Sequence, residues 1–104
     1  MQPNLIYINE LSVGDDSFKI HLISVLKKEF SSEASDYFCS MLSNNFKQAL
    51  VNVDKLKHKI IILGLEKGYE TASSFEDSLI ENKTCGQEEF ESILETIGSF
   101  LNRI

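Results

Sequence analysis

The sequence contains few of the residues that interrupt helices or cross-link small folds. Its 104 residues include one proline, five glycines, two cysteines and no tryptophan. Scarce proline and glycine leave few residues that end a helix, which favours long helices over a strand-rich fold with many turns. Cys39 and Cys85 match no metal-ligand spacing and are too few for a disulfide framework. We therefore expect a helical protein with reduced, mostly buried thiols.

Positive charge is also scarce. Ten Lys and Arg residues stand against sixteen Asp and Glu residues, a net charge of −6. Nucleic acids and anionic membranes need a basic surface, so neither is expected as a partner. No apolar run approaches the ~20 residues that cross a bilayer. The N-terminus lacks a basic stretch followed by a long apolar run, so it does not match a signal peptide. We expect a cytoplasmic protein.

Composition and apolar spacing predict one all-α domain over residues 1–104. At 42% hydrophobic and 25% charged, the chain is typical of a globular protein, and it is too short to form two cores. Apolar residues recur at three- and four-residue steps, the period of an amphipathic helix. The expected helices cover residues 5–11, 17–43, 46–63, 69–81 and 90–101. Short loops between them favour antiparallel neighbours in an up-down bundle.

Specific residues define the expected ends and faces of these helices. Asn4 is expected to cap the first helix and Gly64 or Gly68 to end the third. Residues 31–33 could bend or split the long helix. Residues 60–63 alone would suit a buried strand, but they continue a helical stripe and have no partner strand. The residues expected to face inward include Leu56, Ile60, Leu63, Phe75 and Ile80, and the periodic apolar run of the long helix includes Phe18, Val25, Phe38 and Leu42.

Residues 54–64, Asp-Lys-Leu-Lys-His-Lys-Ile-Ile-Ile-Leu-Gly, resemble the signature of histidine-containing phosphotransfer (HPt) domains. That signature reads His-x-Leu-Lys-Gly-x-x-x-x-Leu-Gly. It ends in a small residue, two spacers, an apolar residue and Glu, which Ala72, Phe75 and Glu76 match. Residues 7–15 and Phe18 also look like the family's usual start. The resemblance implies an antiparallel four-helix bundle with a short extra N-terminal helix and a site residue presented sideways to solvent.

Two positions depart from the family pattern. Asp54 stands where the phospho-accepting histidine is expected, and His58 stands where the family usually has glycine. In the family, an exposed imidazole takes a phosphoryl group from a receiver's aspartyl phosphate, and nearby lysines offset the added charge. Lys55, Lys57 and Lys59 would supply that charge here, although three helical lysines also suit a solvated face. Receivers carry phosphate on Asp with bound Mg²⁺ and an acidic pocket, which a lone helical Asp does not have.

His58 is the candidate for a relocated phospho-acceptor. It lies about 6 Å along the helix from Asp54 and about 40° around it. Phosphoryl transfer needs its reacting atoms within about 3–3.5 Å, so a receiver docked for position 54 would have to slide by one helical turn. His21 has no companions and is expected at the surface. His21 and His58 lack the further ligands of a metal site, so no metal or other cofactor is expected.

The interpretation favoured by the sequence is a degenerate, pseudo-phosphotransfer protein of two-component signalling, a mediator rather than an enzyme. It would bind the receiver domain of a response regulator or hybrid histidine kinase as a monomer, and the initial methionine favours a whole protein. The expected binding residues are Asp54, Lys55, Lys57, His58, Ile61 and Leu65.

Two alternatives remain open. The chain could be an active phosphotransfer protein that uses His58, or a helical interaction module unrelated to the phosphorelay, since fold does not fix function. An exposed apolar rim around a charged centre would favour receiver docking. A uniformly polar face would favour the interaction module.

Overall fold

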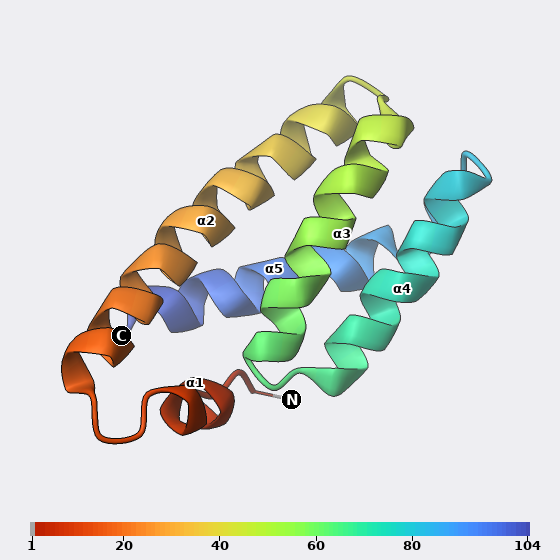
Figure 1. Ribbon diagram of the computed structural model, residues 1–104. Coiled ribbons are helices and arrows are strands. Elements are labelled where there is room, and N and C mark those ends of the chain that lie inside the picture. Colours follow the sequence, from red (N-terminus) through yellow and green to blue (C-terminus); the bar gives the residue numbers. More distant parts are fainter. Residues whose placement is uncertain (1) are drawn as a thin grey trace.

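Five helices make up the regular structure of residues 2–104, which the computed structural model describes (Figure 1). They are α1 (Ile6–Leu11), α2 (Asp16–Leu42), α3 (Phe46–Ile62), α4 (Glu66–Ile80) and α5 (Gln87–Asn102). No strand occurs in this part of the chain, so the all-helical prediction is confirmed. Helix α2 continues without a break through residues 31–33, and the apolar run at 60–63 closes α3 rather than forming a strand.

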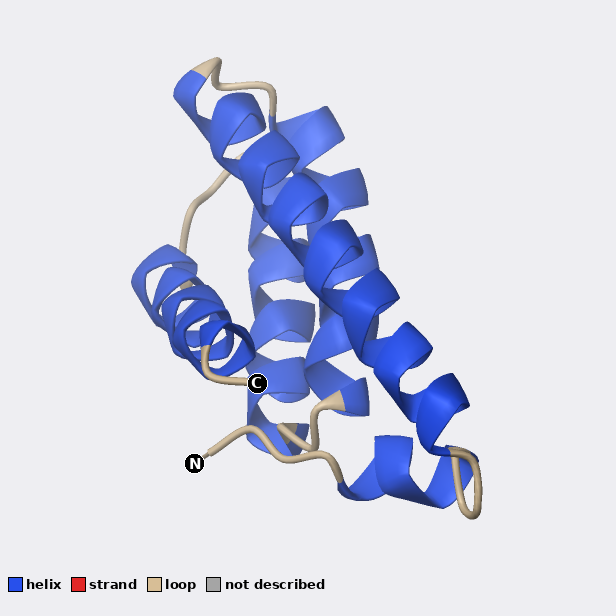
Figure 2. Ribbon diagram, turned by 90° about the vertical axis from the view of Figure 1, so that its left-hand side faces the viewer, coloured by secondary structure: helices blue, strands red, loops and turns tan. Residues whose placement is uncertain are grey.

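Helices α2, α3 and α4 lie side by side, and successive helices run in opposite directions (Figure 1). The connections at residues 43–45 and 63–65 are short, which forces each helix to return along its predecessor. Helix α5 crosses behind these three and brings the C-terminus back to the beginning of α2; Figure 2 shows it outside their layer. No helix within residues 2–104 has both the length and the apolar character needed to span a membrane.

Side-chain caps explain where α2 and α3 begin, and a side chain also bonds to an amide at the start of α1. The carboxylate of Asp15 accepts a hydrogen bond from the Phe18 amide at 2.9 Å, and Asn45 accepts one from Gln48 at 3.1 Å. Each bond satisfies an amide that has no partner inside its own helix. The Asn4 side chain accepts a hydrogen bond from the Ile6 amide at 3.1 Å, although Leu5 and not Asn4 occupies the N-cap position of α1.

Gly64 ends α3 and turns the chain into α4. Its φ of 82° lies in the left-handed region that glycine adopts without strain. The Gly64 amide bonds to the Ile61 carbonyl at 3.0 Å, and the Leu65 amide bonds to the Ile60 carbonyl at 3.2 Å. This pair of bonds is a Schellman motif, in which the residue after the glycine packs back onto the last turn of the helix. Gly68, the other predicted end point, is instead buried within α4.

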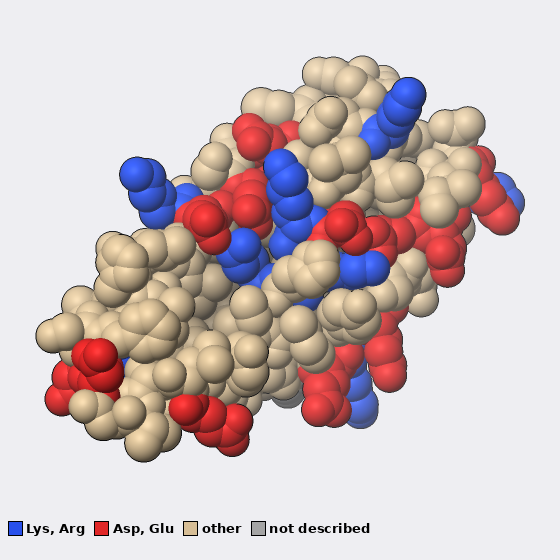
Figure 3. All heavy atoms as spheres, viewed as in Figure 1, with Lys and Arg blue, Asp and Glu red and all other residues tan. Residues whose placement is uncertain are grey.

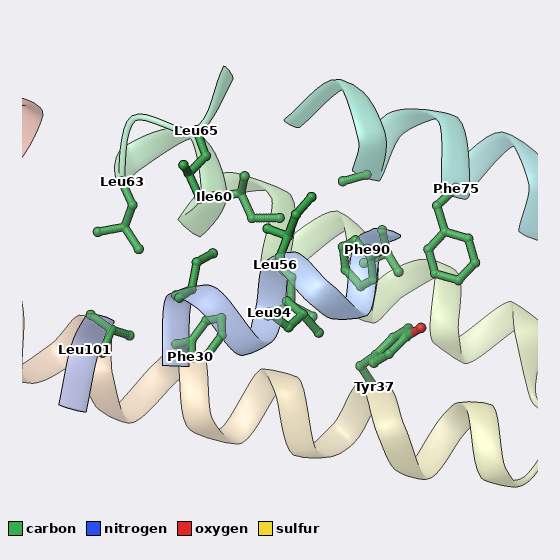
Figure 4. Close-up of a cluster of buried hydrophobic side chains, with 14 of the residues drawn as sticks. Phe30, Tyr37, Leu56, Ile60, Leu63, Leu65, Phe75, Phe90, Leu94 and Leu101 are labelled. Atoms are coloured by element: carbon green, nitrogen blue, oxygen red, sulfur yellow. The ribbon is translucent and has the colours of Figure 1, made fainter. Parts of the chain in front are cut away.

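Apolar side chains from all five helices form one core (Figure 4). Leu56, Ile60 and Leu63 are fully buried, as the helical spacing predicted. At the other end of the core, the rings of Tyr37, Phe75 and Phe90 join α2, α4 and α5. The centroid of Phe90 lies 5.1 Å from that of Tyr37 and 5.2 Å from that of Phe75.

Ile80, which was expected to face inward, is exposed, and so are four residues of the periodic apolar run on α2: Phe18, Val25, Phe38 and Leu42. Phe18 lies in the first turn of α2, which extends beyond the end of α3 (Figure 1). Ile80 is the last residue of α4, where no further helix covers it.

The prediction that the cysteines are mostly buried is wrong. Cys39 lies on an outward face of α2, and Cys85 lies in the loop before α5. Apolar spacing could not reveal this, because a cysteine contributes little to the pattern on which the helix faces were assigned.

Candidate functional site

Asp54 projects from the middle of α3 into solvent, with 57% of its side chain exposed. Its carboxylate lies 3.6 Å from the ammonium group of Lys57, one turn further along the helix. Figure 3 shows lysines gathered over the middle of α3, with acidic side chains on either side. Asp54 is therefore exposed, as the resemblance implied for the site residue, and it is paired with a lysine one helical turn away.

Lys57 was expected to be exposed, but only 17% of its side chain is accessible. Helix α4 covers it. The ammonium group lies 2.6 Å from a Glu76 carboxylate oxygen and 5.4 Å from the centre of the Tyr69 ring. The hydrogen bond to Glu76 raises the pKa of Lys57 against the opposing effect of burial. Lys57 is thus a bridge between α3 and α4 rather than a freely available cation.

The other two lysines of the segment differ in availability. Lys59 points toward α2, where its ammonium group lies 3.2 Å from Glu29 and 3.5 Å from Glu33. Lys55 is exposed and has no ion-pair partner within residues 2–104. Two of the three positive charges expected to support a phosphorylated residue are therefore already matched by carboxylates.

His58 and Ile61 are exposed on the same outward face of α3, as predicted, and His21 is exposed on α2. The prediction that Leu65 lines the site is wrong, because that side chain is 1% exposed. The Schellman motif at Gly64 turns Leu65 under the first turn of α4 and into the core. Spacing along α3 could not place this side chain, because Leu65 lies beyond the end of the helix and its direction is set by the turn at Gly64.

Val51 and Ile80 belong to the site although the sequence did not indicate them. A shallow hollow between α3 and α4 is lined by Asp54, Glu76 and Asp77 together with Leu50, Val51 and Ile80. Val51 and Ile80 are exposed, so they form an apolar rim beside the carboxylate of Asp54. The outward position of Val51 on α3, one turn before Asp54, could have revealed the first of them.

Within residues 2–104, neither Asp54 nor His58 is held by several polar partners. Asp54 is a solvated carboxylate held by one shared lysine, and His58 has no hydrogen-bonding partner within residues 2–104 to orient its ring. Nucleophilic and general-base groups in active sites are ordinarily fixed by such partners. Over the same residues, no three His, Cys, Asp or Glu side chains come together as metal ligands.

Comparisons of the chain with models of known protein families, with curated proteins and with solved structures found no match. The function proposed below therefore rests on the geometry of α3 and α4 and on the signature-like spacing.

Replacing Lys57 with methionine should destabilise the protein by about 1–3 kcal/mol, because Glu76 would lose the cationic partner that it has within residues 2–104 while remaining mostly covered. The raised pKa of Lys57 makes this contribution complete at neutral pH, and it fades as the pH rises beyond the ordinary lysine value of 10.5. Chemical denaturation measures the loss. Lys55→Met is the matched control, with an expected change within about 0.5 kcal/mol. Equal effects of the two substitutions would show that the Lys57–Glu76 pair is unimportant.

Proposed function

We propose that the chain is an HPt-like protein of two-component phosphorelay signalling that binds receiver domains without carrying phosphate at position 54. In this proposal α2 to α5 correspond to the four-helix core of the family, and α1 is the extra N-terminal helix. Such a protein would compete with active phosphotransfer proteins for the same receiver and so reduce the flow of phosphate through it.

The proposal rests on a contact between a signature residue of α3 and a signature residue of α4. Lys57 and Glu76 both fall on the family pattern, on different helices, and their side chains meet at 2.6 Å. They do so directly beside Asp54, the residue at the phosphohistidine position, which is exposed. A chance match of common residues in sequence would not be expected to bring these particular side chains together.

The surface around Asp54 also suits docking. Val51, Ile61 and Ile80 are exposed apolar residues on the same side as Lys55 and His58. An apolar rim around a charged centre is typical of protein interfaces, where aliphatic contacts exclude water and charges select the partner. This was the feature expected to distinguish receiver docking from a uniformly polar face.

A binding experiment tests the proposal. Purified receiver domains from the same cell would be titrated into the protein, and affinity measured by calorimetry for parent and variants. Ile80→Asp places a charge on the rim and should weaken binding about tenfold or more. Ile20→Asp is the matched control, because Ile20 is 69% exposed on α2 and Ile80 is 65% exposed beside Asp54. Absence of binding to every receiver, or equal affinity of the two variants, would refute the proposal.

Phosphotransfer through His58 is a second candidate function, because that imidazole is exposed on the same face of α3. It would require the receiver to dock one helical turn away from the position that the family uses. The labelling experiment described in the Discussion separates the two candidates.

A further inference from the structure

A groove separate from the α3 surface runs between α2 and α5. It consists of two hollows, of about 380 and 540 Å³, that share Ala34. Residues 27, 31, 34 and 38 line it from α2, and residues 88, 91, 95, 98 and 102 line it from α5. Both sets advance in three- and four-residue steps, so each is one continuous stripe along its helix.

The floor of the groove is apolar. Phe30, Leu94 and Leu101 lie between the two helices, as Figure 4 shows, and Ala34 adds a small side chain at the centre. Phe38 contributes a ring that is 41% exposed although it stands against that of Tyr37. An exposed aromatic ring beside an apolar floor is the kind of feature that anchors a partner side chain.

One end of the groove is strongly acidic. Glu88, Glu91 and Glu95 line the larger hollow, and no Lys or Arg lines it. Glu91 accepts hydrogen bonds from the Tyr37 hydroxyl and from Gln87, each at 2.9 Å, so it is held in place. Glu88 and Glu95 are exposed and have no ion-pair partner within residues 2–104. Their charges are available to a basic partner.

Gly98 leaves space at the other end of the groove. It lies in the interior of α5, where glycine is a poorer helix former than alanine. A Cβ atom added here would meet nothing within 4 Å, so packing inside the protein does not exclude a side chain at this position. The absent side chain lets another backbone approach α5 closely.

We propose that this groove docks a basic amphipathic helix of another protein. The apolar face of that helix would lie on Ala34, Phe38 and Leu94, its lysines or arginines would pair with Glu88 and Glu95, and its backbone would pass close to Gly98. A second copy of this chain is a poor occupant, because its net charge of −6 would oppose the same acidic rim. The inference does not depend on receiver binding at α3.

Three synthetic peptides of about 18 residues, long enough to span the groove as a helix, serve as probes. One carries leucines on one helical face and lysines on the other. The second replaces every lysine with glutamate, and the third keeps the first composition but scrambles the leucine spacing. Fluorescence anisotropy should give the first peptide an affinity at least about tenfold higher than either of the others.

Two pairs of variants locate the binding. Glu95→Lys should weaken binding of the lysine peptide about tenfold. Glu89→Lys changes the net charge by the same amount on the opposite side of α5, and it should change the affinity of this peptide less than about twofold. Gly98→Leu should also weaken binding about tenfold while the melting temperature stays the same or rises, because leucine is a better helix former than glycine. Ser99→Leu makes a comparable change outside the groove and should leave affinity unchanged.

Several results would overturn the inference. The first is a lysine peptide that does not bind, and the second is equal binding of the lysine and glutamate peptides. The third is an equal loss of affinity for the two members of either pair of variants. Chemical-shift changes confined to α3 and α4 would place the peptide elsewhere. A concentration-dependent dimer that Gly98→Leu dissociates would assign the groove to a second copy of the chain.

Discussion

Replacing Asp54 with histidine, together with His58→Gly, should make the protein accept phosphate from a phosphorylated receiver. The new imidazole would occupy an exposed position. The ammonium group of Lys57 already lies 3.6 Å from the Asp54 carboxylate that the imidazole would replace. In the transfer, the acyl phosphate bond of the receiver breaks and a nitrogen–phosphorus bond forms. The receiver recovers its carboxylate, and the imidazole loses its N–H proton. Glycine at position 58 removes a side chain that would obstruct close approach.

The measurement is acid-labile, base-stable phosphate on the protein after incubation with a labelled receiver. The parent should show little label, Asp54→His some, and the double variant most. Asp54→Asn, which supplies no imidazole, is the control and should remain unlabelled. Strong labelling of the parent that disappears in His58→Ala would instead establish the relocated histidine as the acceptor. Absence of label in every variant, with no receiver binding, would leave only the helical interaction module.

Truncating Phe75 to alanine should cost about 3–5 kcal/mol, the largest loss of stability that we expect from a single change. The ring is fully buried, and it contacts Phe90 at 5.2 Å and Tyr37 at 6.2 Å between centroids. Its removal would leave a cavity where three helices meet, and the surrounding helices can close it only in part. Leu63→Ala should cost about 2–5 kcal/mol for the same reason.

Thermal melts of the parent protein, Phe75→Ala and Leu63→Ala test this assignment of core residues. A loss of this size should lower the melting temperature by well over 10 °C, since about 4–8 °C accompanies each kcal/mol in a domain of this length. Ile80→Ala is the control, because that side chain is exposed and its truncation should change stability by about 0.5 kcal/mol or less. A Phe75→Ala melt within a degree or two of the parent would contradict the packing described above.

Much of the fold could be predicted from the sequence because the signals are local. Periodic apolar residues placed α2, α3 and α5 within a few residues of their true limits, and Gly64 ended α3 as expected. The crossing of α5 behind the other helices could not be predicted in this way. It depends on how side chains from different helices fill the space between them, which no single helix encodes.

The candidate site was predicted less completely, for a related reason. Asp54, His58 and Ile61 are exposed because they face outward on an isolated helix. Lys57 and Leu65 were misplaced because their environment comes from α4, through an ion pair in one case and a turn in the other. Ile80 lies near Asp54 for the same reason, whereas Val51 is on α3 itself, one turn before Asp54. Contacts between helices therefore account for both errors and for the omission of Ile80.

The hydrogen bond from the Asn4 amide to the Leu63 carbonyl, at 2.8 Å, bears on the order of folding. It closes a loop that spans more than half of the chain, which is entropically costly to form before the intervening helices exist. Helices α2, α3 and α4 instead contact their neighbours in sequence through short connections, which form quickly. We therefore expect α1 to dock last, onto an α3–α4 turn that is already complete, and to be among the first elements released when the protein unfolds.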